Sequence, residues 1–215
     1  MGQFFKPDNM IASKSGAGNN WAKGYYSEGC EIIGEVLERI RQEAEIADCM
    51  QGFQLTHSIG GGTGSGFGSM LLNKLSEEYS SKILFNFSVL PGSSSELGPS
   101  DVVVEPYNAL LSLNSIVENS HLALPIENSS LYRICTKNLG MKEVSFADIN
   151  YLIAQAMSNA TATMRFPGMQ NNSDIRKICT NLIPFPRLHL ITQGQAPLVA
   201  RGTSKYITMD EKELT

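Results

Sequence analysis

The stretch Gly60-Gly61-Gly62-Thr63-Gly64-Ser65-Gly66 decides how the rest of this sequence is interpreted. It follows residues 52–59, which alternate like a β-strand, and it precedes apolar residues at helical spacing from Phe67 to Tyr79. Glycines between a strand and a helix let the backbone approach an anion, and the helix N-terminus adds free N–H groups and partial positive charge. Five glycines interleaved with hydroxyls therefore predict a phosphate-binding loop.

Two common phosphate motifs do not fit this loop. A Walker A loop has Lys after its last glycine, but Phe67 follows Gly66 here. The dinucleotide pattern GxGxxG also fails, because counting from Gly62 and Gly64 its last glycine falls on Phe67. An unrelated dehydrogenase-like domain is therefore disfavoured. The other open alternative is a glycine turn that only lets the helix pack closely on the strand.

The patterns around the loop predict an α/β fold. A helix is expected over 26–47, a buried strand over 83–90, and a helix from Glu105 with Tyr107, Leu110, Leu111 and Val117 facing inward. Strand–helix–strand spacing of this kind indicates a parallel sheet covered by helices. Further along, a capping box at Ser145–Asp148 opens a helix to Ala160, a helix covers 174–182, and a strand covers 187–192.

Composition excludes several classes of protein. The 215 residues are 42% hydrophobic, with a formal charge of −4 and a pI near 5.4, which argues against a general nucleic-acid binder or a basic membrane-surface protein. No apolar run reaches the roughly 18 residues of a membrane span, and the first residues carry no secretion signal. The four scattered cysteines are expected to be reduced and mostly buried, as in a cytosolic protein.

Beyond these local patterns, the sequence resembles the β-tubulin family along essentially its whole length. The glycine run is the family's signature. The segments that also match are Ser15-Gly16-Ala17-Gly18-Asn19-Asn20-Trp21-Ala22-Lys23-Gly24, Gln51 to Ser58, Val103-Val104-Glu105-Pro106-Tyr107-Asn108 and Pro184-Phe185-Pro186-Arg187-Leu188-His189.

The resemblance implies a site for GTP or GDP, and it distributes residues around that nucleotide. The expected phosphate contacts are Ser58, Gly62, Thr63 and Gly64, with a second loop of Gly16, Ala17, Gly18 and Asn19. Asp101 and Glu105 would accept hydrogen bonds from the ribose hydroxyls. Asn128 and Asn150 would form hydrogen bonds with the edge of the guanine base, and Phe146 would stack on its face. Taken singly, these asparagines are ordinary caps or turns, Phe146 is a core residue and Glu105 is a solvated helix start.

The resemblance also sets the domain organisation. It implies a Rossmann-like GTPase domain of the tubulin type, incomplete, over residues 1–160, and a core helix with the beginning of an α+β intermediate domain over 161–215. About half of a tubulin is covered, and the family's first strand, first phosphate loop and Mg²⁺-engaging acidic residue have no counterpart. Two loops, near 92–100 and 171–172, are longer than in the family. The isolated chain is therefore expected to bind GTP weakly or not at all.

The implied function is that of a β-tubulin-like, guanine-nucleotide-binding structural subunit of microtubules in the cytoplasmic cytoskeleton. Its expected partners are an α-tubulin-like subunit, the microtubule lattice and tubulin-folding chaperones, with no nucleic acid or membrane. GTPase activity would need a loop from a neighbouring subunit. Lys177 occupies the position where α-type chains carry an activating Glu, so this chain would leave its neighbour's nucleotide uncleaved. The alternative is a truncated or decayed paralogue that neither binds GTP nor polymerises and acts at most as an interaction fragment.

Overall fold

A computed structural model describes residues 4–92, 102–166, 168 and 174–202 and shows an α/β fold built on a parallel sheet. The strands β1 (Gly52–Ser58), β2 (Ile83–Leu90) and β3 (Leu122–Glu127) lie in the order β1-β2-β3. All pairings are parallel, with Gly52 opposite Ile83 and Phe85 opposite Leu122. The expected strand–helix–strand unit is confirmed.

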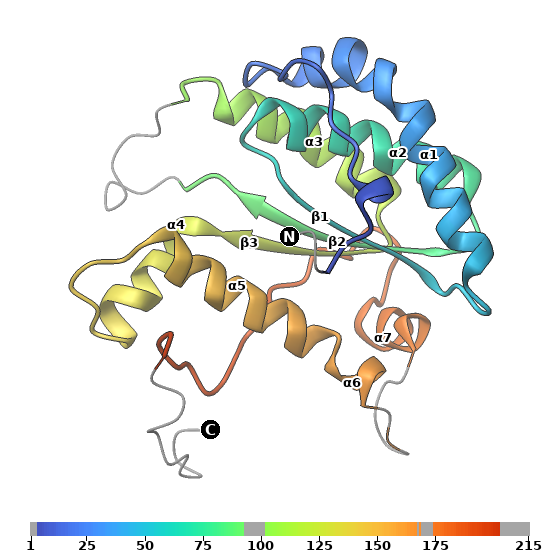
Figure 1. The fold of residues 1–215 in the computed structure, drawn as a ribbon. Helices are drawn as coiled ribbons and strands as arrows, with labels where there is room; N and C mark the ends of the chain where they lie inside the picture. The colour runs from blue at the N-terminus through green and yellow to red at the C-terminus, as the bar shows by residue number, and fades with distance from the viewer. Residues whose placement is uncertain (1–3, 93–101, 167, 169–173, 203–215) are drawn as a thin grey trace.

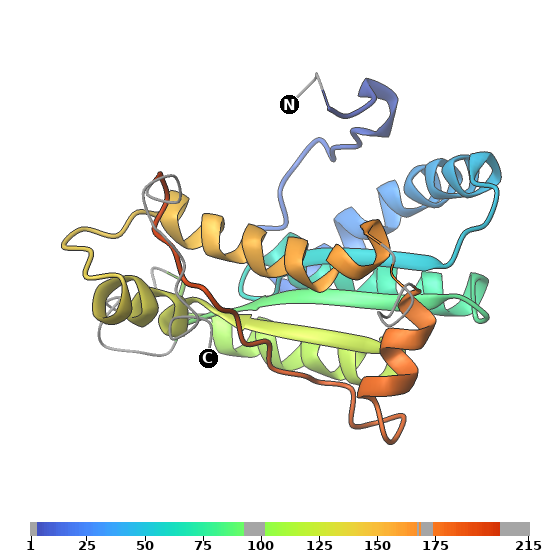
Figure 2. The same cartoon turned by 90° about the horizontal axis from the view of Figure 1, so that it is seen from below.

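Helices cover both faces of the sheet (Figures 1 and 2). One face carries α1 (Glu28–Ile46), α2 (Gly68–Glu78) and α3 (Glu105–Asn119), and the other carries α5 (Phe146–Ala160) and α7 (Ile175–Leu182). The short elements are η1 (Pro7–Asn9), η2 (Lys23–Ser27), η3 (Thr63–Phe67), α4 (Asn128–Arg133), η4 (Ile134–Asn138) and α6 (Ala162–Arg165).

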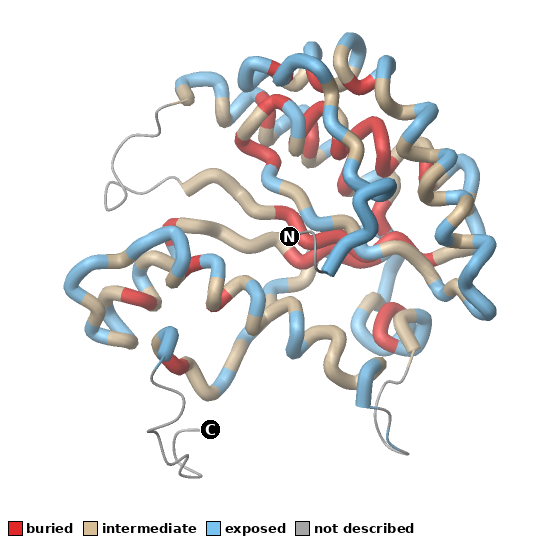
Figure 3. The backbone as a smooth tube through the Cα atoms, viewed as in Figure 1, coloured by how far each residue is buried: buried red, intermediate tan, exposed pale blue. Residues whose placement is uncertain are grey.

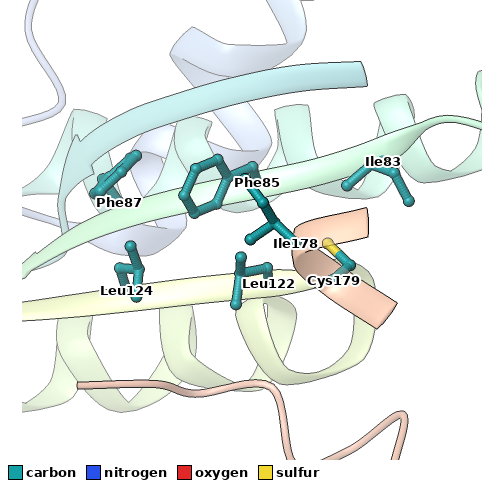
Figure 4. Close-up of a cluster of buried hydrophobic side chains, with 7 residues drawn as sticks. All are labelled: Ile83, Phe85, Phe87, Leu122, Leu124, Ile178 and Cys179. Atoms are coloured by element: carbon teal, nitrogen blue, oxygen red, sulfur yellow. The ribbon is translucent and has the colours of Figure 1, made fainter. Parts of the chain in front are cut away.

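The middle strand β2 forms the centre of the core because both of its faces are covered. Its first six residues are buried (Figure 3), as expected of a buried strand, although Asn86 and Ser88 interrupt the apolar run. Phe85 and Phe87 face α5 and α7, and their ring centroids are 4.6 Å apart (Figure 4). Leu84 points to the opposite face, where it packs with Leu71 and Leu75 of α2.

The orientation predicted for α3 is wrong for three of its four residues, and the fourth, Val117, is half-buried. Tyr107 and Leu110 are each 70% exposed and Leu111 is 46% exposed, whereas the buried side chains are Asn108, Ser112, Ser115 and Ile116. Small and polar residues form the inner face because α3 packs closely against α2 and the glycine loop, where Asn108 and Ser112 also find hydrogen-bond partners.

Other local expectations have mixed outcomes. The Ser145–Asp148 capping box is confirmed. Residues 187–192 form a single bridge, Leu190 to Ala123, rather than a strand, and β3 was not predicted.

Cys135 and Cys179 are buried, but Cys30 and Cys49 are exposed; all four are free. None of the helices in the described ranges is long and apolar enough to cross a membrane.

Candidate functional site

The glycine run brings the first turns of two helices together at the carboxyl ends of the strands. Both η2, which leads into α1, and η3, which leads into α2, are π-helical turns. A Cβ on Gly66 would lie 2.8 Å from the backbone N of Tyr25 and closer still to the carbonyl O of Trp21. A Cβ on Gly24 would overlap the carbonyl of Gly62. The two turns therefore meet backbone to backbone, which only glycine permits.

The second expected phosphate loop, Gly16 to Asn19, lies directly against this run. Gly18 and Asn19 have φ of 56° and 53°, and the N–H of Asn20 donates to the carbonyl of Ala17 at 3.1 Å, which together make a tight turn with two left-handed residues. A Cβ on Gly62 would meet the N of Asn20 at 2.6 Å. Cβ atoms on Gly16 and Gly18 would meet nothing within 4 Å, so these glycines border open space beside the loops.

The remaining phosphate and ribose residues gather at the same place. Ser58 ends β1, and a Cβ on Gly64 would lie 3.3 Å from the N of Ser58, so the two segments touch. Glu105 opens α3, and its carboxylate lies 3.4 Å from where a Cβ on Gly60 would be. Asp101 lies outside the described residues. The structure thus brings Ser58, both loops and Glu105 together.

Asn108 connects these parts, although it is not among the predicted site residues. Its side chain is 3% exposed. The amide Nδ2 donates to the carbonyl O of Asn19 at 2.8 Å and to that of Gly60 at 3.0 Å, while Oδ1 accepts from the backbone N–H of Trp21 at 3.0 Å. The available signal was its spacing of three residues from Glu105, which places both on one face of α3.

His57 lies beneath the loop and is a second residue without a predicted role. Its Nδ1–H donates to the carbonyl O of Gly64 at 2.6 Å, which leaves Nε2 to accept from Ser88 Oγ at 3.3 Å. Burial lowers the pKa of His57, against the opposing effect of the hydrogen bond to Gly64. The ring is therefore a neutral support for the glycine run at neutral pH.

The residues expected to read the base lie at the same edge of the sheet, on α4 and α5, which contact each other (Figure 1). Asn128 begins α4 directly after β3 and is half-buried, while Asn150 on α5 is exposed. Phe146 begins α5 and is 75% exposed, so the structure does not support a core role for it. Asn150 lies one turn after Phe146 on α5, so an aromatic ring that can stack on a base and an amide that can pair with its edge share one helix face.

Local hydrogen bonds hold the starts of both helices. The carboxylate of Glu127 accepts from the hydroxyls of Ser129 and Ser130, and these bonds lower the pKa of Glu127. On α5, Asp148 accepts from the N–H and hydroxyl of Ser145, and the pKa of Asp148 is lowered by these bonds. The positions of Asn128 and Phe146 are therefore set by short-range contacts of their own helices.

The opposite edge of the sheet, where the strands begin, carries α7 and Lys177. Gln51 precedes β1; its Nε2 donates to Asp174 Oδ1 at 3.2 Å and its Oε1 accepts from the N–H of Ile175 at 3.2 Å. Arg176 donates to the carbonyl of Ser81, just before β2. Lys177 is exposed on this end of the molecule, away from the glycine loops.

Across the described ranges, no three His, Cys, Asp or Glu side chains gather closely enough to hold a metal ion. Magnesium bound with a nucleotide is held largely by phosphate oxygens and water, and one or two carboxylates complete its coordination. Of the expected site residues, Glu105 is the described carboxylate nearest the glycine loop.

The chain is similar to known proteins of the Tubulin/FtsZ family. The model of the Tubulin/FtsZ family, GTPase domain, matches residues 1–136. The chain is similar to the tubulin beta-6 chain of Gossypium hirsutum, with 51% identity over 215 residues, covering 100% of this chain and 47% of that protein. It is also 51% identical over 214 residues to a tubulin beta chain of Cicer arietinum, of which it covers 46%. The chain thus spans about half the length of the relatives it matches.

Proposed function

The chain belongs to the Tubulin/FtsZ family, and from this membership we propose that it binds guanine nucleotide as a β-tubulin-like subunit. The observation that carries the proposal is the contact between the two glycine-bearing turns, η2 and η3. It holds two helix N-termini side by side, next to open space at Gly16 and Gly18. The first N–H groups of η3 have no partner within the helix, so phosphate oxygens would satisfy them. The first N–H groups of the run through η2 already donate to the side chains of Asn20 and Asn108, so that run would contribute mainly its partial positive charge.

Each group of site residues would recognise one part of the nucleotide. Backbone N–H groups of Gly62, Thr63 and Gly64, with the Ser58 hydroxyl, would bind the phosphates from one side, and residues 16–19 from the other. The Glu105 carboxylate, with Asp101, would accept hydrogen bonds from the ribose. Mg²⁺ would be held mainly by the phosphates, where it would neutralise part of their charge.

Guanine recognition would come from α4 and α5. The amides of Asn128 and Asn150 each offer a donor and an acceptor, which matches the mixed donor and acceptor edge of guanine. The exposed ring of Phe146 would cover one face of the base. The preference for guanine over adenine rests on the family membership, because an amide with both a donor and an acceptor can pair with either base.

The placement of Lys177 supports head-to-tail assembly with an α-tubulin-like subunit in a microtubule lattice. The glycine loops lie at the carboxyl ends of the strands and Lys177 lies at the end where they begin. Stacking subunits in one direction would set Lys177 against the nucleotide of the next subunit, where an ammonium group can pair with phosphate but cannot deprotonate water as a carboxylate does. We place the protein in the cytoplasmic cytoskeleton, with tubulin-folding chaperones as further partners.

The alternative remains a paralogue that neither binds GTP nor assembles, and a titration separates the two. Fluorescent mant-GTP is titrated into the purified chain, and GTP or ATP is added as competitor. Saturable binding displaced by GTP but not by ATP supports the proposal. Asn150→Ala should weaken that binding, whereas Asn114→Ala, a change at an exposed asparagine of α3, should not. No saturable binding at any concentration supports the alternative.

A further inference from the structure

Asn108 is a buried amide whose hydrogen bonds all go to main-chain groups far away in the sequence. Its partners Asn19 and Trp21 precede it by 89 and 87 residues, and Gly60 precedes it by 48. They belong to the two loops that lie together at the carboxyl edge of the sheet. A side chain that served only the packing of α3 would not need partners in both loops.

The contact with Trp21 also satisfies the beginning of a helix. Trp21 is the first residue of the helical run that passes through η2 into α1. The first N–H groups of such a run have no partner inside the helix. Asn108 Oδ1 accepts one of them at 3.0 Å, so a residue of α3 acts as the cap of another helix.

The same side chain fixes the distance between the loops. One N–H of Nδ2 goes to Asn19, in the tight turn, and the other goes to Gly60, where the glycine run begins. Because both bonds start from one nitrogen atom, the two carbonyl groups must stay close together. One turn earlier on α3, the Glu105 carboxylate lies beside Gly60.

We infer that Asn108 is a positioning residue that joins both phosphate-side loops to the ribose-side helix and holds the site in its binding geometry before the nucleotide arrives. A preformed site avoids the entropy cost of ordering loops on binding. The structural part of this inference stands on hydrogen bonds alone. Its consequence for nucleotide affinity rests on the proposed function.

Two substitutions remove these bonds in different ways. Asn108→Asp has nearly the same shape and keeps an acceptor for Trp21, but its second carboxylate oxygen replaces Nδ2 and repels the carbonyl oxygens of Asn19 and Gly60. Asn108→Ala deletes every bond without burying a charge, and it keeps the test valid if the first variant fails to fold. Asn114→Asp is the matched control, since it makes the same chemical change at an exposed position of the same helix.

The first measurement is amide hydrogen exchange of the chain without nucleotide. In the Asn108 variants, exchange at residues 17–24 and 59–66 should rise about tenfold or more, while β2 and β3 keep their protection and Asn114→Asp matches the wild type. Unchanged exchange in both loops would overturn the inference. Loss of protection throughout the sheet in both variants would overturn it too, because Asn108 would then be a general core residue.

The second measurement is mant-GTP affinity. Asn108→Ala should bind about tenfold more weakly than Asn114→Asp, and equal affinities would contradict the positioning role. If the wild-type chain shows no saturable binding, the proposed function fails, and the exchange data alone decide the role of Asn108. The two failures are therefore distinguishable.

Discussion

Replacing Gly66 by alanine tests whether the contact between η2 and η3 controls the site. The new Cβ would lie 2.8 Å from the N of Tyr25 and 2.9 Å from the carbonyl C of Gly24, and nearer still to the O of Trp21. All three atoms are backbone, so no flexible side chain can move aside. Since ordinary contact begins at 3.4 Å, the N of Tyr25 must move away by about 0.6 Å and the O of Trp21 by more.

The cost follows from two opposing effects. Overpacking of this kind costs about 1–3 kcal/mol and occasionally more. Alanine also favours a helix over glycine by up to about 1 kcal/mol, which offsets part of that loss. The net expectation is a destabilisation of about 2 kcal/mol, which for a chain of 215 residues lowers Tm by roughly 4–8 °C.

Thermal unfolding followed by circular dichroism measures this change. The control is Gly34→Ala in α1, where a Cβ would meet nothing within 4 Å, and there the helix preference of alanine should raise Tm by a few degrees. If Gly66→Ala melts at the wild-type temperature, or if Gly34→Ala loses as much stability, the argument from backbone contact is refuted.

Three further outcomes are expected. Burial lowers the pKa of His57, so below about pH 6.5 the unfolded chain takes up a proton that the folded chain does not, and the free energy of unfolding decreases as the pH decreases. In urea unfolding between pH 7.5 and 5.5, His57→Gln should make the free energy of unfolding depend less on pH, and an unchanged dependence would contradict the role of His57. Ser145→Ala removes half of the capping box and should cost about 1 kcal/mol, with a fall in Tm of roughly 2–4 °C; no change would mean that α5 does not depend on its cap. Phe146→Ala should weaken mant-GTP binding about tenfold while Phe146→Tyr preserves it, and equal losses would exclude stacking.

Local patterns predicted the parts of the fold that local physics controls. The run 83–90 became β2, and the glycine stretch became the turn between β1 and its helix, because burial on both faces and helix initiation leave signals within a few residues. β3 was not predicted, since Pro125 interrupts a short segment. That proline is tolerated because Leu190 forms the only described bridge on the outer side of β3, and it pairs at Ala123.

Tertiary contacts determine the features that the sequence alone did not predict, namely the orientation of α3 and the role of Asn108. The apolar stripe of Tyr107, Leu110 and Leu111 was expected to face inward, but periodicity locates a stripe without saying what covers it. For the candidate site, the glycine loop followed from the residues themselves, whereas the base-reading residues came from the family resemblance. Asn108 was not predicted as a site residue because its hydrogen-bond partners are 48 to 89 residues away in the sequence, and no local pattern indicates such a contact.

The glycine-to-glycine approach of η2 and η3 has a consequence for how this protein can diverge. The contact is made by main-chain atoms, which are chemically the same at every position of every protein. Substitutions that keep Gly24, Gly62 and Gly66 leave this close approach sterically possible, whereas a side chain at any of these three positions would force the turns apart.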